Sequence, residues 1–217
     1  MIENAPRSGG NIAYRGASGA IYLNITNRCS SDCVFCLRTW TDGIYGTDLR
    51  LADEPATDDI LAAIEYAYME GPAPEVVFCG LGEPTMRLDV VLAVTEWLRL
   101  RRIRTRLNTN GHAALLNPSV EVAAALAEAG LCAVAVSLNA ADPLAYNAIC
   151  RPTFAKAYRA VLEFAGDCVA NSIETTLTAV DLPEADIPGC EVLAQRLGAA
   201  FRARRLVTSA QQREEEP

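Results

Sequence analysis

The chain has 217 residues, 51% of them hydrophobic, and a formal net charge of −8. This length supports one substantial core and is short for two α/β domains, and the acidic charge lacks the overall basic character of a nucleic-acid-binding protein. The apolar stretch 120–136 is interrupted by Glu and Gly, and the first 19 residues contain no apolar signal core. We therefore expect one cytoplasmic domain without a membrane span.

Strands and helices alternate along the chain once residues 1–20, which we expect to be a flexible segment, are set aside. Runs of β-branched and apolar residues predict strands, and amphipathic stretches with capping residues or Gly at their ends predict helices. The predicted elements, in chain order, are strand 21–26, helix 57–70, strand 75–79, helix 88–100, strand 105–109, helix 119–129, strand 132–138, helical segments that begin at residues 142 and 153, strand 173–180, helix 190–197 and strand 201–207. The globular domain then covers 21–207, and the polar tail 208–217 is predicted to be disordered.

Six strands joined by connections of helical length predict a parallel sheet with right-handed crossovers. Runs such as Val134–Leu138 are apolar on both faces, which is typical of strands covered on both sides. Six strands are too few for a complete eight-stranded barrel, so the candidates are a partial TIM barrel, (β/α)6, and a doubly wound open sheet. We favour an α/β fold of the partial-barrel type, in which active-site residues lie at the carboxyl ends of the strands.

Three cysteines, Cys29, Cys33 and Cys36, lie within eight residues directly after the first predicted strand. Three thiolates from one short loop can reach three corners of an iron–sulfur cube and leave the fourth iron open. Two other interpretations compete with this one. The same spacing puts the cysteines on one face of a helix, where they would be buried residues, although the Asn, Ser and Asp around them are poor residues for a helix core. Zinc would need a fourth ligand, and the chain has a single histidine, His112.

The motif C-x3-C-x2-C, with the aromatic Phe35 just before its third cysteine, resembles the hallmark of the radical S-adenosylmethionine (SAM) superfamily. The resemblance implies that Cys29, Cys33 and Cys36 hold a 4Fe-4S cluster whose open iron is chelated by the amino and carboxylate groups of SAM. It also implies that an electron from the reduced cluster cleaves SAM to methionine and a 5'-deoxyadenosyl radical, which abstracts a hydrogen atom from the substrate. In such an enzyme the protein positions the cofactor and excludes competing reactions.

The second predicted strand ends in Cys79-Gly80-Leu81-Gly82-Glu83-Pro84. By itself this is a Gly-Pro turn whose glycines let the backbone approach a ligand closely. Beside the cysteines it resembles the G-G-E-P motif of the superfamily, with Leu81 in place of the first glycine of that pair. The resemblance implies that this turn contacts the SAM amino group. The expected SAM contacts here are Phe35, Gly80, Leu81, Gly82, Glu83 and Pro84.

Polar residues also end the later predicted strands. Asn108 and Asn110 belong to the third strand end, Ser137 and Asn139 to the fourth, and Thr178 to the fifth. Capping and turn formation explain such residues as readily as ligand contact does. In related radical SAM enzymes, polar residues at the end of the fourth strand contact the SAM ribose and carboxylate. The resemblance therefore implies SAM contacts at Ser137 and Asn139, and more weakly at the other three.

The remaining five cysteines are scattered without ligand spacing, and we expect most of them to be buried small residues. They are Cys79, Cys132, Cys150, Cys168 and Cys190, of which only Cys79 lies near the expected active face. His112 follows an Asn-Gly turn, where an exposed loop position is favoured over a role as proton carrier. The arginines between residues 99 and 106 predict a solvated helix end, and they alone keep a tRNA substrate open.

Longer segments, among them Ile21–Cys29, Phe35–Arg38, Thr41–Gly43, Phe78–Pro84 and Asn108–Gly111, resemble the TatD-associated radical SAM proteins. The resemblance implies a pathway shared with a TatD-like hydrolase, and the chemistry implies reduced flavodoxin or ferredoxin as electron donor. The substrate is not specified by these residues. Two alternatives stay open: a non-catalytic iron–sulfur redox or sensing module, and an activase or tRNA-modifying radical SAM enzyme.

Overall fold

The computed structural model describes residues 10–16, 18–39, 41, 43–44 and 47–206. The strands are β1 (Ala13–Arg15), β2 (Ile21–Leu23), β3 (Gly43–Ile44), β4 (Thr47–Asp48), β5 (Val76–Phe78), β6 (Thr105–Thr109), β7 (Ala133–Ser137), β8 (Glu174–Val180) and β9 (Ala200–Arg204). The α-helices are α1 (Thr57–Met69), α2 (Leu88–Leu100), α3 (Ala113–Leu116), α4 (Val122–Ala129), α5 (Pro143–Cys150), α6 (Ala157–Ala170) and α7 (Ile187–Leu197), and the 3-10 helices are η1 (Leu37–Thr39) and η2 (Pro84–Arg87).

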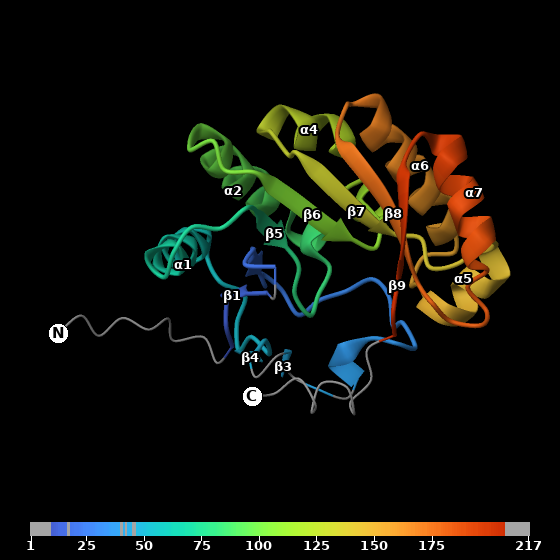
Figure 1. Cartoon of the computed structure of the whole chain (residues 1–217), viewed down its shortest axis with the longest axis horizontal. Helices are drawn as coiled ribbons and strands as arrows, with labels where there is room; N and C mark the ends of the chain where they lie inside the picture. Colours follow the sequence, from blue (N-terminus) through green and yellow to red (C-terminus); the bar gives the residue numbers. More distant parts are fainter. Residues whose placement is uncertain (1–9, 17, 40, 42, 45–46, 207–217) are drawn as a thin grey trace.

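One sheet in the order β1-β2-β5-β6-β7-β8-β9 organises the molecule. Within this sheet every neighbouring pair from β2 to β9 is parallel, so the six predicted strands and their parallel pairing are confirmed, and β3 and β4 form a separate antiparallel pair. The strands follow one another in chain order without a reversal. A doubly wound sheet has a reversal point between its two halves, whereas a barrel does not. The order therefore selects the partial barrel, and Figure 1 shows its strands side by side with helices α2, α4, α6 and α7 along the sheet.

The hydrophobic core lies between the sheet and its helices. Leu107 pairs in register with Val134, and Val136 with Leu177, and all four side chains are buried in this core. Because side chains alternate along a strand, the residues between them face away from the helices. This second face, called the inner face below, is polar: examples from three neighbouring strands are Asn108, Ser137 and Thr178.

The N-terminal part of the described chain departs from expectation. Ala13–Arg15 forms β1, which pairs antiparallel with β2 at the edge of the sheet, so the predicted flexible segment does not extend to residue 20. The β1 sequence Ala-Tyr-Arg is not an apolar run, unlike the equally short β2 and β5, and its three residues are only partly buried. Residues 1–9 and the predicted tail 208–217 lie outside the described residues.

Helix starts differ from the prediction by a few residues, as capping explains. The helical segment predicted to begin at residue 142 is α5, and the Asp142 carboxylate caps it by accepting hydrogen bonds from the amides of Leu144 and Ala145. Helix α7 begins three residues earlier than predicted, because Asp186 caps it and Pro188 fits its first turn. In the described part of the chain, no helix is long and apolar enough to span a membrane.

Candidate cluster and cofactor site

The cysteine loop, residues 29–36, follows β2 and runs beside the end of α5. The amides of Asp32 and Val34 donate to carbonyls at the end of α5, over 3.2 and 2.9 Å. The amide of Thr153 donates in turn to the Ser30 carbonyl over 3.0 Å. These backbone hydrogen bonds fix a loop that has no regular secondary structure of its own, at the carboxyl edge of the sheet. The helical interpretation of the cysteine spacing is therefore wrong for residues 29–36.

The thiols of Cys29, Cys33 and Cys36 are all partly buried and none forms a disulfide. Burial raises the pKa of the Cys29 thiol to about 11 and also raises the pKa of Cys36. A hydrogen bond with the Cys150 thiol raises the pKa of Cys33 and lowers the pKa of Cys150. All three loop thiols are therefore protonated at neutral pH without metal, and iron must displace these protons.

The turn after β5 depends on its glycines. A Cβ atom on Gly80 would lie 2.2 Å from the Asn24 side-chain oxygen, and one on Gly82 would lie 2.4 Å from the carbonyl oxygen of Thr26. The turn thus lies directly against the chain that leads from β2 into the cysteine loop. Only glycine permits this close approach.

Leu81 fills the position where the superfamily motif has its first glycine. Its φ is not positive, so its side chain causes no backbone strain. The side chain is buried, and the Leu81 amide donates to the Asn24 side-chain oxygen over 3.2 Å. The substitution is accommodated because this position requires neither a left-handed backbone nor an open space.

Glu83 is buried and its carboxylate accepts four hydrogen bonds. Oε1 accepts from the Thr85 amide, the Thr85 hydroxyl and the Thr109 hydroxyl, at 3.0, 2.7 and 2.8 Å. Oε2 accepts from the Asn110 amide at 2.6 Å. Burial raises the pKa of this carboxyl group. Glu83 therefore joins the end of β5 to the end of β6, and its contact with SAM stays a prediction.

The expected exposed position of His112 is wrong: the residue is 0% exposed and directly precedes α3. Its Nδ1 hydrogen-bonds with the Ser30 hydroxyl over 2.9 Å, and its Nε2 with the Tyr146 hydroxyl over 2.7 Å. Burial lowers the pKa of His112 to about 4, so the ring is neutral. The Asn-Gly turn correctly predicted a loop before His112. The cysteine loop and α5 cover that loop, so the histidine is buried.

Asn110 extends this network to the cysteines. Its side-chain nitrogen donates to the Ser30 hydroxyl over 2.9 Å and lies 3.8 Å from the Cys29 sulfur. Its side-chain oxygen accepts from the His112 amide over 3.0 Å. Asn110 therefore orients the first cysteine of the loop.

Asn139 and Cys150 support the second cysteine. The Asn139 side-chain nitrogen donates to the Cys150 sulfur over 3.4 Å, and Cys150 hydrogen-bonds with Cys33. Asn139 is buried and has a φ of 60°, a backbone conformation that Asn tolerates better than most residues. Cys150 is buried as expected, but it also contacts a predicted cluster ligand.

The other predicted SAM contacts lie at the same edge of the sheet. Asn108 accepts a hydrogen bond from Arg106 over 2.6 Å. Ser137 and Thr178 lie in register on neighbouring strands, and within the described residues neither hydroxyl is engaged in a hydrogen bond. Phe35 packs against the core, and Pro84 is buried at the start of η2.

The residues present fit a cluster with a SAM molecule beside it. The donor set is three thiols on one loop, with an amide nitrogen near Cys29, and the buried hydroxyl of Ser31 has no partner within the described chain. The turn 80–84 and the hydroxyls of Ser137 and Thr178 offer polar groups along the same edge. No three His, Cys, Asp or Glu side chains among the described residues gather closely enough for one metal ion. Thiolates are the usual ligands of iron–sulfur clusters, so Cys29, Cys33 and Cys36 are the residues that would hold one.

The arginine group between residues 99 and 106 makes contacts within the protein. Arg101 stacks on Trp97 at 3.5 Å, Arg104 pairs with Glu174 at 2.6 Å, and Arg106 pairs with Glu75 at 2.7 Å. The arginines thus lie at the end of α2 and the start of β6, in agreement with the predicted helix end that leads into a strand.

Residues 23–187 match the family model described as the radical SAM superfamily. The chain belongs to this superfamily. Membership places it among radical SAM enzymes, with a 4Fe-4S cluster and SAM as cofactors, and so confirms the expected class and cofactors.

Among individual proteins, the Fe-coproporphyrin III synthase of Methanosarcina barkeri (strain Fusaro / DSM 804) is 34% identical over 119 residues, which are 55% of this chain and 27% of that protein. The structure of Streptococcus suis SuiB bound to S-adenosylmethionine superposes with a TM-score of 0.67 at 16% identity, over 88% of this chain and 41% of SuiB. TYW1 with a lysine-pyruvate adduct bound gives a TM-score of 0.62 at 16% identity, over 90% of this chain and 67% of TYW1. The chain thus matches only part of each, and the structural likeness confirms the fold.

Sequence reasoning missed several residues of the site. Ser30 lies in the cysteine loop, and Tyr146 and Cys150 support that loop from α5. Each contacts a residue far away in the chain, so no local pattern marks it.

Proposed function

We propose that this chain is a radical SAM enzyme that holds a 4Fe-4S cluster with Cys29, Cys33 and Cys36 and reductively cleaves SAM to act on an unknown substrate. One observation carries the proposal. The loop with three thiols lies at the carboxyl edge of the sheet, against the glycine turn 80–84, with backbone hydrogen bonds to the end of α5. When bound, the cluster and SAM supply an electron and a 5'-deoxyadenosyl radical at this edge.

The remaining residues of the edge position these groups. Asn110 and Ser30 orient Cys29, and Asn139 with Cys150 orients Cys33. The hydroxyls of Ser137 and Thr178, which no described residue engages, and the turn 80–84 are the groups that bind SAM in this proposal.

Several finer predictions belong to this proposal. Reduced flavodoxin or ferredoxin supplies the electron, and a TatD-like hydrolase acts in the same pathway, as the resemblance to TatD-associated proteins suggests. The cytoplasmic location is supported by free cysteines at all eight positions.

The direct test is formation of 5'-deoxyadenosine by the anaerobically reconstituted chain with SAM and dithionite. The wild-type chain should form it only with reductant, Cys36→Ser should form none, and the matched control Cys168→Ser should form it at the wild-type rate. Cys168 is suited to this control because it is buried in α6, remote from the loop in sequence. A chain that binds the cluster but never cleaves SAM would instead be a redox or sensing module.

A further inference from the structure

Arg204 differs from every other partly buried arginine in the described chain. Arg15, Arg38, Arg87 and Arg106 each contact carbonyl or carboxylate oxygens. Among the residues that the structure describes, the Arg204 side chain has no hydrogen bond or ion pair, and its buried Nε lacks a partner. Burying the Nε of a charged side chain without a partner costs free energy, so this nitrogen points to a ligand that would bind the guanidinium group.

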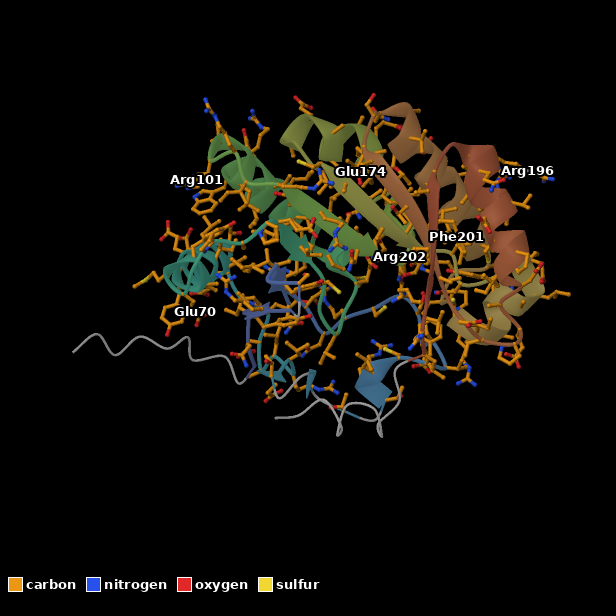
Figure 2. All side chains as sticks on the ribbon, viewed as in Figure 1. Glu70, Arg101, Glu174, Arg196, Phe201 and Arg202 are labelled. Carbon is orange, nitrogen blue, oxygen red and sulfur yellow. The ribbon has the colours of Figure 1, made fainter. Side chains whose placement is uncertain are left out.

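Strand β9 turns two arginines toward the inner face. Phe201 packs against the core, so Arg202 and Arg204, which alternate with it and Ala203, face the other way. Figure 2 labels Phe201 and Arg202 at neighbouring positions along β9, with Phe201 toward the side of α7. Arg202 is exposed and, within the described residues, also has no partner. Two unpaired positive charges thus lie one strand repeat apart.

The register joins these arginines to the cofactor edge. Arg202 lies in register with Thr178, which lies in register with Ser137, so two free hydroxyls and a guanidinium form one row across three strands. Arg204 lies two residues further along β9, in register with Val180 at the end of β8. The arginines therefore border the place where the radical would be formed.

We propose that Arg202 and Arg204 form an anion-binding site on the inner face of β9 that anchors a carboxylate or phosphate group of the substrate beside SAM. The inference rests on the proposed function for its location, and it adds the chemical class of the substrate. Guanidinium groups suit this task because they bind both anions through paired, charge-assisted hydrogen bonds. Two such groups side by side repel each other until an anion lies between them.

The test is calorimetric titration of the reconstituted, SAM-saturated chain with succinate and, separately, with inorganic phosphate. We compare the wild type with Arg202→Gln, Arg204→Gln and the matched control Arg196→Gln, an exposed arginine on the neighbouring helix α7. The wild type and the control should bind at least one of the two anions equally well. Each β9 variant should bind it roughly tenfold more weakly, as expected for loss of a charge-assisted hydrogen bond. Because Arg202 is exposed, its variant keeps the fold even if Arg204→Gln does not.

Three results would overturn the inference. The first is no anion binding, or equal binding by all four proteins. The second is an equal loss of SAM affinity in the β9 variants, which would assign the anion to the SAM carboxylate. The third is an altered cluster potential in Arg204→Gln with unchanged anion affinity. Titration of the cluster-free chain with the same anions separates the two proposals. If this chain still bound the anion while the cluster-loaded chain failed to cleave SAM, only the proposed function would be contradicted.

Discussion

At the scale of single residues, Glu83 holds two strand ends together through four hydrogen bonds to one buried carboxylate. Glu83→Ala leaves these donors without an acceptor and should lower the free energy of unfolding by about 3 kcal/mol or more. Glu83→Gln keeps the shape and should cost about 1–2 kcal/mol, because its amide nitrogen cannot accept. Urea unfolding of the cluster-free chain measures both.

The exposed Glu65 on α1 provides the control, since Glu65→Gln should change stability by less than about 0.5 kcal/mol. If Glu83→Ala were as stable as this control, the role of Glu83 in joining β5 to β6 would be wrong.

His112 predicts a pH dependence of stability. Its pKa is lowered from 6.5 to about 4 in the folded chain, so between these values the unfolded chain binds the proton and the folded chain does not. Acidification in this range therefore favours unfolding. Between pH 7.5 and 5.2 this group should lower the free energy of unfolding by roughly 2 kcal/mol. His112→Asn should lower the free energy of unfolding at both pH values, but this free energy should then depend less on pH. An unchanged dependence of the free energy of unfolding on pH would show that His112 is not buried as described.

At the scale of elements, the glycine turn after β5 can be compared with a glycine in a helix. A Cβ on Gly82 would clash with the Thr26 and Arg28 carbonyl oxygens, at 2.4 and 2.5 Å, whereas on Gly166 in α6 its nearest atom would be 3.7 Å away. Gly82→Ala should lower the free energy of unfolding by about 1–3 kcal/mol and reduce iron uptake, because the cysteine loop must shift. Gly166→Ala should raise it by about 0.5–1 kcal/mol through helix propensity, with normal iron uptake. Equal effects of the two substitutions would contradict this account.

Elements with local signals could be predicted from the sequence, and elements without them could not. Strands β5 and β7 have continuous apolar runs, β6 and β8 are rich in β-branched Thr residues, and α5 has an Asp-Pro start, so these elements were predicted. Strand β1 has only three residues and depends on β2 for its hydrogen bonds. The hydrogen bonds of His112 join it to Ser30, which is 82 positions away in the chain, and to Tyr146, which is 34 positions away. No periodicity in the sequence encodes such contacts. The candidate cysteines were predicted because their motif is local.

At the scale of the whole molecule, the cysteine loop closes the carboxyl edge of a sheet whose strands are already paired. The loop is tied to residues 149–153 through backbone hydrogen bonds, whereas β6 and β7 form a continuous ladder. Cluster loading should therefore slow hydrogen exchange in residues 29–36 and 149–153 and leave β6 and β7 unchanged. Hydrogen-exchange mass spectrometry of the cluster-free and loaded chains measures this, and slowing spread evenly over the sheet would contradict it.

The central claim is that three cysteines hold a 4Fe-4S cluster and leave one iron free to bind SAM. The electron paramagnetic resonance spectrum of the reduced, reconstituted chain tests it most directly, recorded before and after SAM is added. We predict a cluster signal whose g values change with SAM, and its loss in Cys36→Ser. A cluster signal that SAM leaves unchanged, or the absence of any cluster signal in the wild-type chain, would contradict the claim.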